Sequence, residues 1–181
     1  MQTFIRQNFR WIAGGFALTY FSSFGQTYFI SASIAEWQAA FGLSHGEFGR
    51  LYMYATLGSA ACLPFIGRLV DHIAADKMIA FVVPVLAGAT LLAGFSTSLV
   101  LLVFAIFLLR LFGQGMMTHM ALTATGRWFH AERGRAVSLV VLGHQGGEAT
   151  IPLVFSAITL AYGLQAGWSV AALALLVVGL P

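Results

Sequence analysis

The chain has 181 residues, of which 59% are hydrophobic and 8% are charged, and its formal net charge is +3. Soluble domains usually contain about 25% charged residues. The composition therefore excludes an ordinary soluble enzyme, a disordered chain and a nucleic-acid-binding domain, and it makes the lipid bilayer the expected surroundings.

Six apolar segments are long enough, or nearly long enough, to cross a bilayer as helices, which takes about 20 residues. In chain order they are 11–31, 49–70, 78–97, 99–125, 136–160 and 167–181. No alternating strand pattern accompanies them. The sequence thus predicts an all-α membrane protein, a six-transmembrane-helix bundle that occupies the whole chain, residues 1–181.

Two of these segments carry a further expectation each. The first is too long for a secretory signal, so we interpret it as a retained membrane span. The last has 15 residues, about 22 Å of helix against a hydrocarbon core of about 30 Å. We therefore expect a fragment or a truncated gene product, and we favour a fragment of a longer protein.

The basic residues between the segments predict the orientation. Seven of them fall on one side of the predicted membrane and only Arg50 falls on the other; the seven are Arg6, Arg10, Arg68, Lys77, Arg127, Arg133 and Arg135. Loops rich in Lys and Arg stay in the cytoplasm. We expect a multi-pass protein of a bacterial-type inner (plasma) membrane with a cytoplasmic N-terminus.

Ionisable residues inside the segments are costly in lipid and usually face a cavity or a partner. Arg110 lies about 17 Å along the fourth segment, and Glu148 lies about 18 Å along the fifth from the opposite side, so both are near the midplane. His144 shares a helix face with Glu148. Two interpretations remain open: Arg110 serves an anionic substrate or a coupling step, or it pairs permanently with Glu148.

Other polar and small residues extend this candidate site. Gln114 lies one turn beyond Arg110, and Gln26 belongs to a polar cluster on the first segment that lines a cavity or makes interhelical hydrogen bonds. Gly143 and Gly147 are spaced for close helix packing. The strongly apolar third and sixth segments are expected to face lipid.

The loop from Gly67 to Lys77 resembles the signature loop of the major facilitator superfamily, which lies between the second and third helices. The matching residues are Gly67, Leu69, Asp71 and Lys77, whereas His72 and Ala74 depart from the family pattern. The resemblance implies a gate in which Asp71 meets a neighbouring helix end and basic groups, with Arg68 and Lys77 nearby. It also implies that the chain is the N-terminal six-helix half of a transporter with a second, missing half.

Two further likenesses concern substrate and coupling. Arg110 is similar to a fourth-helix arginine of this family, which implies a role in proton coupling, with Glu148 or His144 exchanging a proton. The run from Arg127 to Ala136, followed by Gly143 and Gly147, resembles the monocarboxylate and oxalate/formate branch. The resemblance implies alternating-access transport of a small organic anion such as a monocarboxylate.

Alternatives remain at this point. They are efflux of an amphipathic drug-like solute and a membrane assembly subunit that does not transport. An intramembrane enzyme is disfavoured because the sequence contains neither G-x-S-x-G nor H-E-x-x-H. We expect no cofactor, no metal and no nucleic-acid partner.

Overall fold

The computed structural model describes residues 2–179, and this part of the chain is helical almost throughout. The elements are α1 (Gln2–Phe21), η1 (Ser22–Gly25), α2 (Thr27–Ile30), η2 (Ser31–Ser33), α3 (Ile34–Phe41), α4 (His45–Gly67), α5 (Leu69–His72), α6 (Ala75–Gly94), α7 (Leu99–Leu108), η3 (Leu109–Met117), α8 (Thr118–Trp128), α9 (Arg133–Tyr162) and α10 (Leu164–Gly179). No strand occurs between residues 2 and 179. Residues 180 and 181 of the last predicted segment lie outside the described residues.

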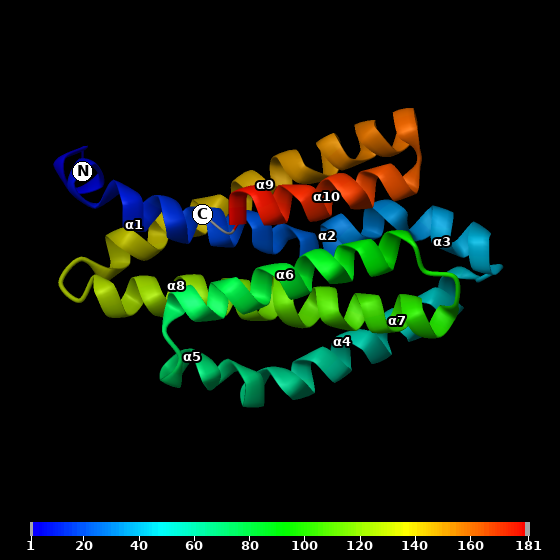
Figure 1. Cartoon of the computed structure of the whole chain (residues 1–181), viewed down its shortest axis with the longest axis horizontal. Helices are drawn as coiled ribbons and strands as arrows, with labels where there is room; N and C mark the ends of the chain where they lie inside the picture. Colours follow the sequence, from blue (N-terminus) through cyan, green and yellow to red (C-terminus); the bar gives the residue numbers. More distant parts are fainter. Residues whose placement is uncertain (1, 180–181) are drawn as a thin grey trace.

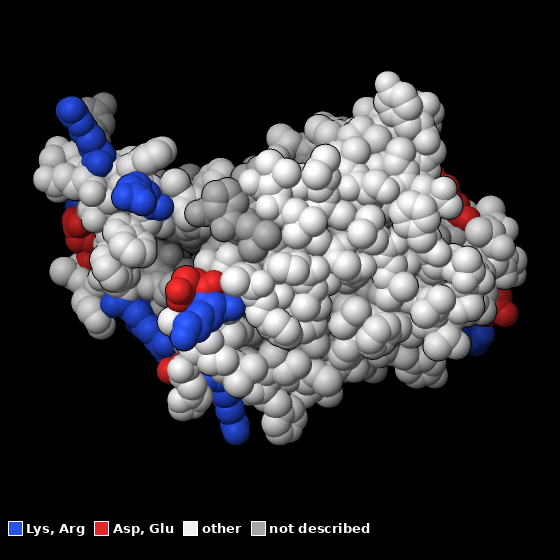
Figure 2. Space-filling model, viewed as in Figure 1, with Lys and Arg blue, Asp and Glu red and all other residues white. Residues whose placement is uncertain are grey.

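These elements form a bundle of elongated helical rods (Figure 1). The N-terminus, α5 and the turn between α8 and α9 lie together at one end, which we call the basic end because it carries the seven Lys and Arg residues named above. Figure 2 shows blue and red side chains only near the two ends of this face, with a broad uncharged band between them. An uncharged band across the long axis is what a bilayer requires of the surface that it surrounds.

Three helices are long and apolar enough to cross a membrane by length and composition: His45–His72, Ala75–Gly94 and Leu99–Trp128. The first predicted segment, 11–31, differs most from the observed helix. The helix already begins at Gln2, through a polar stretch with a kink at Asn8, and it ends at Phe21. α9 is long but carries Arg133, Arg135 and Glu148, which lower its hydropathy.

Local capping explains where two of the helices begin. The Ser44 hydroxyl accepts a hydrogen bond from the Glu47 amide, and the Glu47 carboxylate accepts one from the Ser44 amide, so α4 starts with a capping box. The Ser98 hydroxyl likewise accepts from the Leu101 amide at the start of α7. Each cap satisfies amides that the first helical turn leaves without partners.

The helices α1 and α9 pack closely against each other. A Cβ atom on Gly147 would lie 2.7 Å from the Tyr20 carbonyl oxygen, and one on Gly143 would overlap the Phe16 carbonyl oxygen. The Thr19 hydroxyl donates to the Val140 carbonyl oxygen at 2.5 Å. The close helix packing that the spacing of Gly143 and Gly147 predicts is therefore present, because only glycine lets the two backbones approach this closely.

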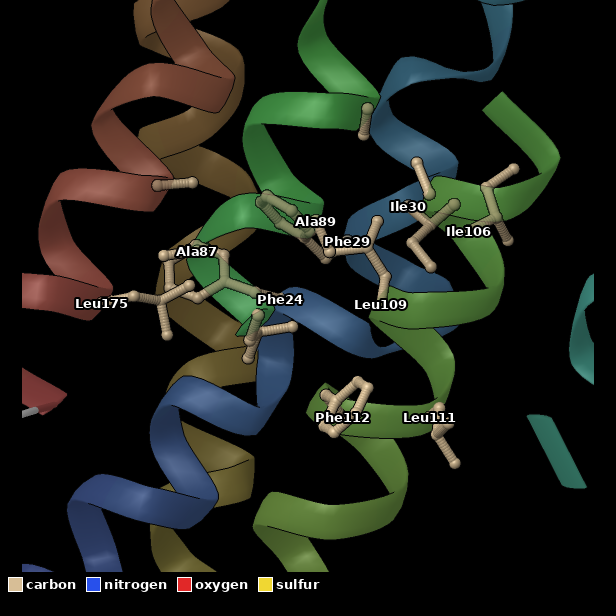
Figure 3. Close-up of a cluster of buried hydrophobic side chains, with 14 of the residues drawn as sticks. Phe24, Phe29, Ile30, Ala87, Ala89, Ile106, Leu109, Leu111, Phe112 and Leu175 are labelled. Atoms are coloured by element: carbon tan, nitrogen blue, oxygen red, sulfur yellow. The ribbon is translucent and has the colours of Figure 1, made fainter. Parts of the chain in front are cut away.

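The expectation that the third and sixth helices mainly face lipid is wrong for much of their surface. α6 and α10 pack against each other, and Val82, Leu86 and Leu175 are fully buried. Figure 3 shows side chains of these two helices meeting others from the first helix and from the α7–η3 region in one apolar core. Uniform hydropathy does not distinguish a helix buried in protein from one that faces lipid.

Candidate functional site

We call α1, η1 and α2 together the first rod. This rod is interrupted at the middle of the bundle. Its path changes to a short 3-10 helix at Ser22–Gly25, and Gln26 is extended, with φ −84° and ψ 153°, before helix resumes at Thr27. Opposite this break lies the fourth rod, which consists of α7, η3 and α8. It has π-helical geometry over Leu109–Met117. Irregular turns of this kind occur often at functional sites.

The two irregular segments cross at Gly25 and Gly113. A Cβ atom on Gly113 would lie 2.6 Å from the Gly25 Cα, and one on Gly25 would lie 2.5 Å from the Gln114 amide nitrogen. The crossing therefore tolerates no side chain at either position. It places Arg110, on the first turn of η3, beside the break in the first rod.

Arg110 is fixed by groups from two other rods. Its Nη1 donates to the Gly25 carbonyl oxygen at 3.3 Å and to the Thr27 hydroxyl at 3.2 Å. Its Cζ lies 5.7 Å from the centre of the Tyr52 ring, and the Tyr52 hydroxyl is 2.8 Å from the Thr27 hydroxyl. We call Gly25, Thr27, Tyr52 and Arg110 the Arg110 cluster.

One edge of the guanidinium has no protein partner among the described residues. The Arg110 Nε is buried without a hydrogen bond, and no contact of Nη2 with a hydrogen-bond acceptor is found in residues 2–179. An unpaired buried N–H costs about 1–3 kcal/mol. The Nε and Nη2 hydrogens together form the fork that binds a carboxylate through two parallel hydrogen bonds.

The permanent Arg110–Glu148 pair, one of the two interpretations above, is not formed. Within residues 2–179 the ion pairs join Arg127 to Asp71 and Arg135 to Glu132, and Glu148 is exposed on α9. The two residues are not brought together because the arginine turns toward the break in the first rod.

His144 is half-buried one turn before Glu148. Its Nδ1 is buried without a hydrogen-bond partner in the part of the chain that the structure describes, and its ring meets the ring of Tyr28 edge to face, with centroids 6.0 Å apart. Tyr28 in turn donates its hydroxyl proton to Ser23 at 2.7 Å. Ser23, Tyr28 and His144 thus form a second set of polar side chains, which come from the first rod and α9. The residues of the Arg110 cluster come from the first rod, α4 and η3.

The two predicted glutamines differ in position. Gln114 is half-buried at the Gly25 crossing, and Gln26 is 8% exposed at the break itself. Of the polar residues around Gln26, the hydroxyl of Thr27 bonds to Arg110 and Tyr52. The two interpretations of this polar cluster are that it lines a cavity or that it makes interhelical hydrogen bonds. Interhelical hydrogen bonds are observed at Thr27.

At the basic end, Asp71 of α5 pairs with Arg127 at the end of α8, and Arg127 also donates to the Val70 carbonyl oxygen at 3.2 Å. Arg68 and Lys77 are exposed and make no ion pair with the other described residues. Asp71 thus meets a neighbouring helix end, as the resemblance implies, but its basic partner is Arg127. Gly67 packs at the end of α4, where a Cβ atom would lie 3.7 Å from His119.

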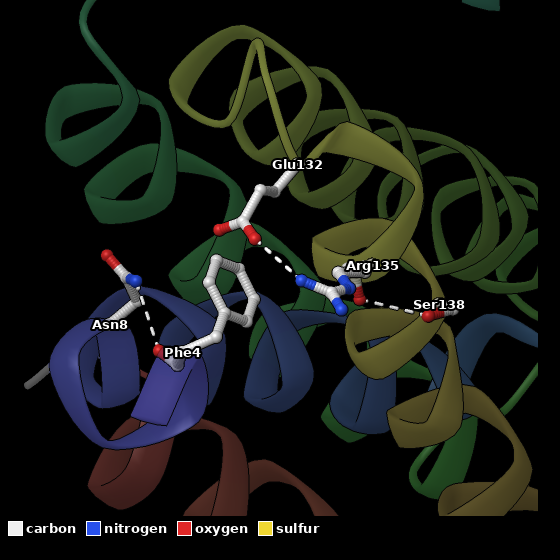
Figure 4. Close-up of polar contacts among 5 residues, drawn as sticks. All are labelled: Phe4, Asn8, Glu132, Arg135 and Ser138. Carbon is white, nitrogen blue, oxygen red and sulfur yellow. Dashed lines mark hydrogen bonds and ion pairs between the residues drawn. The ribbon is translucent and has the colours of Figure 1, made fainter. Parts of the chain in front are cut away.

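Figure 4 shows the second ion pair of the basic end, in which Arg135 donates to Glu132 at 2.8 Å beside the start of α1. A hollow of about 730 Å³ also opens at this end between α1, α5, α6 and α8, and Asp71 and Arg127 line it. None of its lining residues belongs to the Arg110 cluster. We place the candidate binding site at Arg110, because unpaired polar atoms occur there.

Replacing Asp71 with asparagine should lower the thermal midpoint only slightly. Both partners of the pair are half-exposed, at 50% for Asp71 and 55% for Arg127, and exposed pairs contribute about 0–1 kcal/mol. Thermal unfolding of Asp71→Asn, with Lys77→Gln as an unpaired charged control, measures this. A loss of folded protein in Asp71→Asn alone would contradict the small expected contribution.

Sequence reasoning missed Gly25, Thr27 and Tyr52 as neighbours of Arg110, and Tyr28 as the neighbour of His144. A serine- and glycine-containing interruption within an apolar segment, Ser22-Ser23-Phe24-Gly25, is a signal that could have indicated the break. No comparable signal identifies Tyr52, because an aromatic residue within an apolar helix is ordinary. Its role depends on how α4 is rotated in the bundle.

The helical bundle, its apolar helices of membrane-spanning length and its uncharged band (Figure 2) define an integral membrane protein. The family model described as Major Facilitator Superfamily matches residues 16–181. The chain therefore belongs to the major facilitator superfamily, whose members are transporters rather than enzymes. Comparisons with curated proteins and with solved structures gave no match.

Proposed function

We propose that this chain forms one half of a secondary transporter that carries a small organic anion, such as a monocarboxylate, by alternating access. The observation that carries this proposal is the unpaired Nε of Arg110, which is buried and has no hydrogen bond within the described residues. A carboxylate that binds there satisfies both the charge and the hydrogen-bonding capacity of the guanidinium.

The position of Glu148 favours a bound substrate anion over an internal carboxylate as the partner of Arg110. Glu148 is exposed and does not reach Arg110, so the arginine has no carboxylate of its own within the described residues. A cation held in a membrane interior without a counter-charge is costly. A substrate carboxylate would remove that cost when it binds, and this difference favours anionic over neutral drug-like solutes.

His144 and Glu148 are the proposed proton-exchanging groups. The buried Nδ1 of His144 has no hydrogen-bond partner among the described residues, and imidazole side chains serve as proton shuttles in proteins. Glu148 lies one turn further along the same face of α9. Both residues belong to a rod that packs along α1, so a change of charge on α9 would act on the packing of the first rod.

The proposed orientation has the basic end in the cytoplasm of a bacterial-type inner membrane. Seven basic residues at that end against Arg50 at the other support it. The Asp71–Arg127 pair would then belong to the inner gate, with Gly67, Arg68 and Lys77 around it. A second six-helix bundle would face the Arg110 cluster and complete the passage at the membrane midplane.

The test measures uptake of radiolabelled lactate and oxalate by the full-length protein in proteoliposomes. Arg110→Ala should reduce uptake at least about 100-fold, and Arg110→Lys should retain a small part of it, because lysine lacks the planar fork. Glu148→Gln should leave substrate binding intact but reduce the dependence of uptake on a proton gradient.

The same preparations supply the control. Arg50→Ala removes an exposed arginine at the opposite end and should transport like the wild type. Unchanged uptake in Arg110→Ala, at normal levels of folded protein, would refute the assignment of the anion site.

A further inference from the structure

The hydrogen bond between Thr27 and Tyr52 joins the first rod to α4 directly beside Arg110. We propose that Thr27 and Tyr52 are positioning residues that set the orientation of the Arg110 guanidinium and so determine how tightly the protein binds a carboxylate. This inference rests on the proposed function, in which Arg110 is the anion-binding residue.

The need for such positioning follows from the side chain itself. Arginine has a long, flexible stem, and ordering it costs up to about 2 kcal/mol of rotamer entropy. Bidentate recognition requires the plane of the guanidinium to be fixed before the ligand arrives, since otherwise the ligand's binding energy is spent on ordering it. Arg110 therefore benefits from contacts that hold Nη1 and leave the hydrogens of its Nε edge without a protein partner.

The Arg110 cluster has this division. Nη1 carries both protein hydrogen bonds, to the Gly25 carbonyl oxygen and to the Thr27 hydroxyl, whereas Nε carries none. The Tyr52 ring restricts the guanidinium from the α4 side at 5.7 Å. The contacts thus hold one end of the guanidinium, and the edge that matches a carboxylate has no hydrogen bond to the described residues.

Thr27 is the central member because it makes two bonds. Its oxygen accepts a hydrogen bond from Arg110 and shares a second, 2.8 Å hydrogen bond with the Tyr52 hydroxyl. The side chain is exposed, so without Tyr52 its hydroxyl could rotate freely. Tyr52 therefore acts on Arg110 in two ways, through its ring and through the threonine hydroxyl.

The chain offers a set of matched variants. Thr27→Val and Tyr52→Phe each remove one hydroxyl without changing the size of the side chain much. Thr27→Ser keeps the hydroxyl and should restore wild-type behaviour. Tyr54→Phe removes a hydroxyl from an exposed tyrosine two residues further along α4, which has no part in the cluster, and serves as the control.

The experiment measures concentration-dependent uptake of radiolabelled lactate by the full-length protein in proteoliposomes. Thr27→Val and Tyr52→Phe should each raise KM about tenfold, with kcat changed less than about twofold, which corresponds to the loss of one ordered side chain. The double variant should not exceed the larger single effect by much, because both residues act through Arg110. Thr27→Ser and Tyr54→Phe should match the wild type.

The outcomes separate this inference from the proposed function. Wild-type KM in both Thr27→Val and Tyr52→Phe, with transport abolished in Arg110→Ala, would overturn the positioning role and leave the anion site standing. A fall in kcat with constant KM, together with a lower thermal midpoint, would also overturn it, since that is the result of a purely structural role. Full transport by Arg110→Ala would refute the proposed function itself.

Discussion

Replacing Gly25 with alanine is expected to prevent the accumulation of correctly folded protein or to lower its thermal midpoint by about 6–12 °C. The added Cβ would overlap the Leu109 carbonyl oxygen and would lie 2.5 Å from the Gln114 amide nitrogen and 2.7 Å from the Gly113 Cα. All three are backbone atoms of η3, which cannot move aside as a side chain can. Overpacking a well-packed crossing costs about 1–3 kcal/mol or more, and we expect the upper end here.

Gly14→Ala is the matched control for this variant. Gly14 belongs to α1, and a Cβ at that position would have no atom within 4 Å. Alanine is the better helix former by about 1 kcal/mol, so Gly14→Ala should be as stable as the wild type or more stable. Size-exclusion chromatography of the detergent-solubilised protein and a thermal unfolding curve measure both variants. Equal stability of Gly25→Ala and Gly14→Ala would show that the crossing is looser than described.

Trp168→Ala should destabilise the bundle by about 3–5 kcal/mol. Trp168 is fully buried, and its ring packs against Phe29, Phe155 and Trp37 with centroid distances of 5.1, 5.3 and 5.6 Å. Its Cβ also fills the space left by Gly94 on α6. Removal of the indole would leave a cavity among three aromatic rings and separate α10 from the first rod.

Two comparisons make the cause of that loss clear. Trp168→Phe keeps most of the aromatic volume and deletes an indole nitrogen that has no hydrogen bond in the described part of the chain, so it should lose much less stability. Trp128→Ala removes an indole that is 58% exposed and should lower the thermal midpoint least. A ranking with Trp128→Ala as the most harmful variant would contradict the packing at Trp168.

Hydropathy could predict the all-helical membrane class because long apolar runs leave few other possibilities. It could not predict the start of the first helix, since Arg6, Asn8 and Arg10 lower the local hydropathy although α1 extends through this stretch, with a kink at Asn8. Hydropathy also could not predict which helices face lipid. α6 is strongly apolar, yet Val82, Val83 and Leu86 are fully buried against protein.

For the candidate site, the sequence predicts a depth in the membrane, but it does not predict the direction in which each side chain points. The rise per residue places Arg110 and Glu148 at the same level of the membrane. Whether they face each other depends on the rotation of each helix, and the π-helical stretch and the Gly25 crossing set that rotation for Arg110. Both are tertiary features, so the partner of Arg110 in this chain is a backbone carbonyl and a threonine that no spacing rule indicates.

The π-helical stretch also bears on how this chain should be compared with its relatives. A π turn holds more residues than an α turn, so a relative with a regular α-helix between Leu108 and Thr118 would have about one residue fewer there. An alignment of the two would need a gap within a membrane span, directly at the arginine. An alignment that forbids gaps inside helices would shift the register and pair Arg110 with the wrong position, which would make a shared arginine look absent.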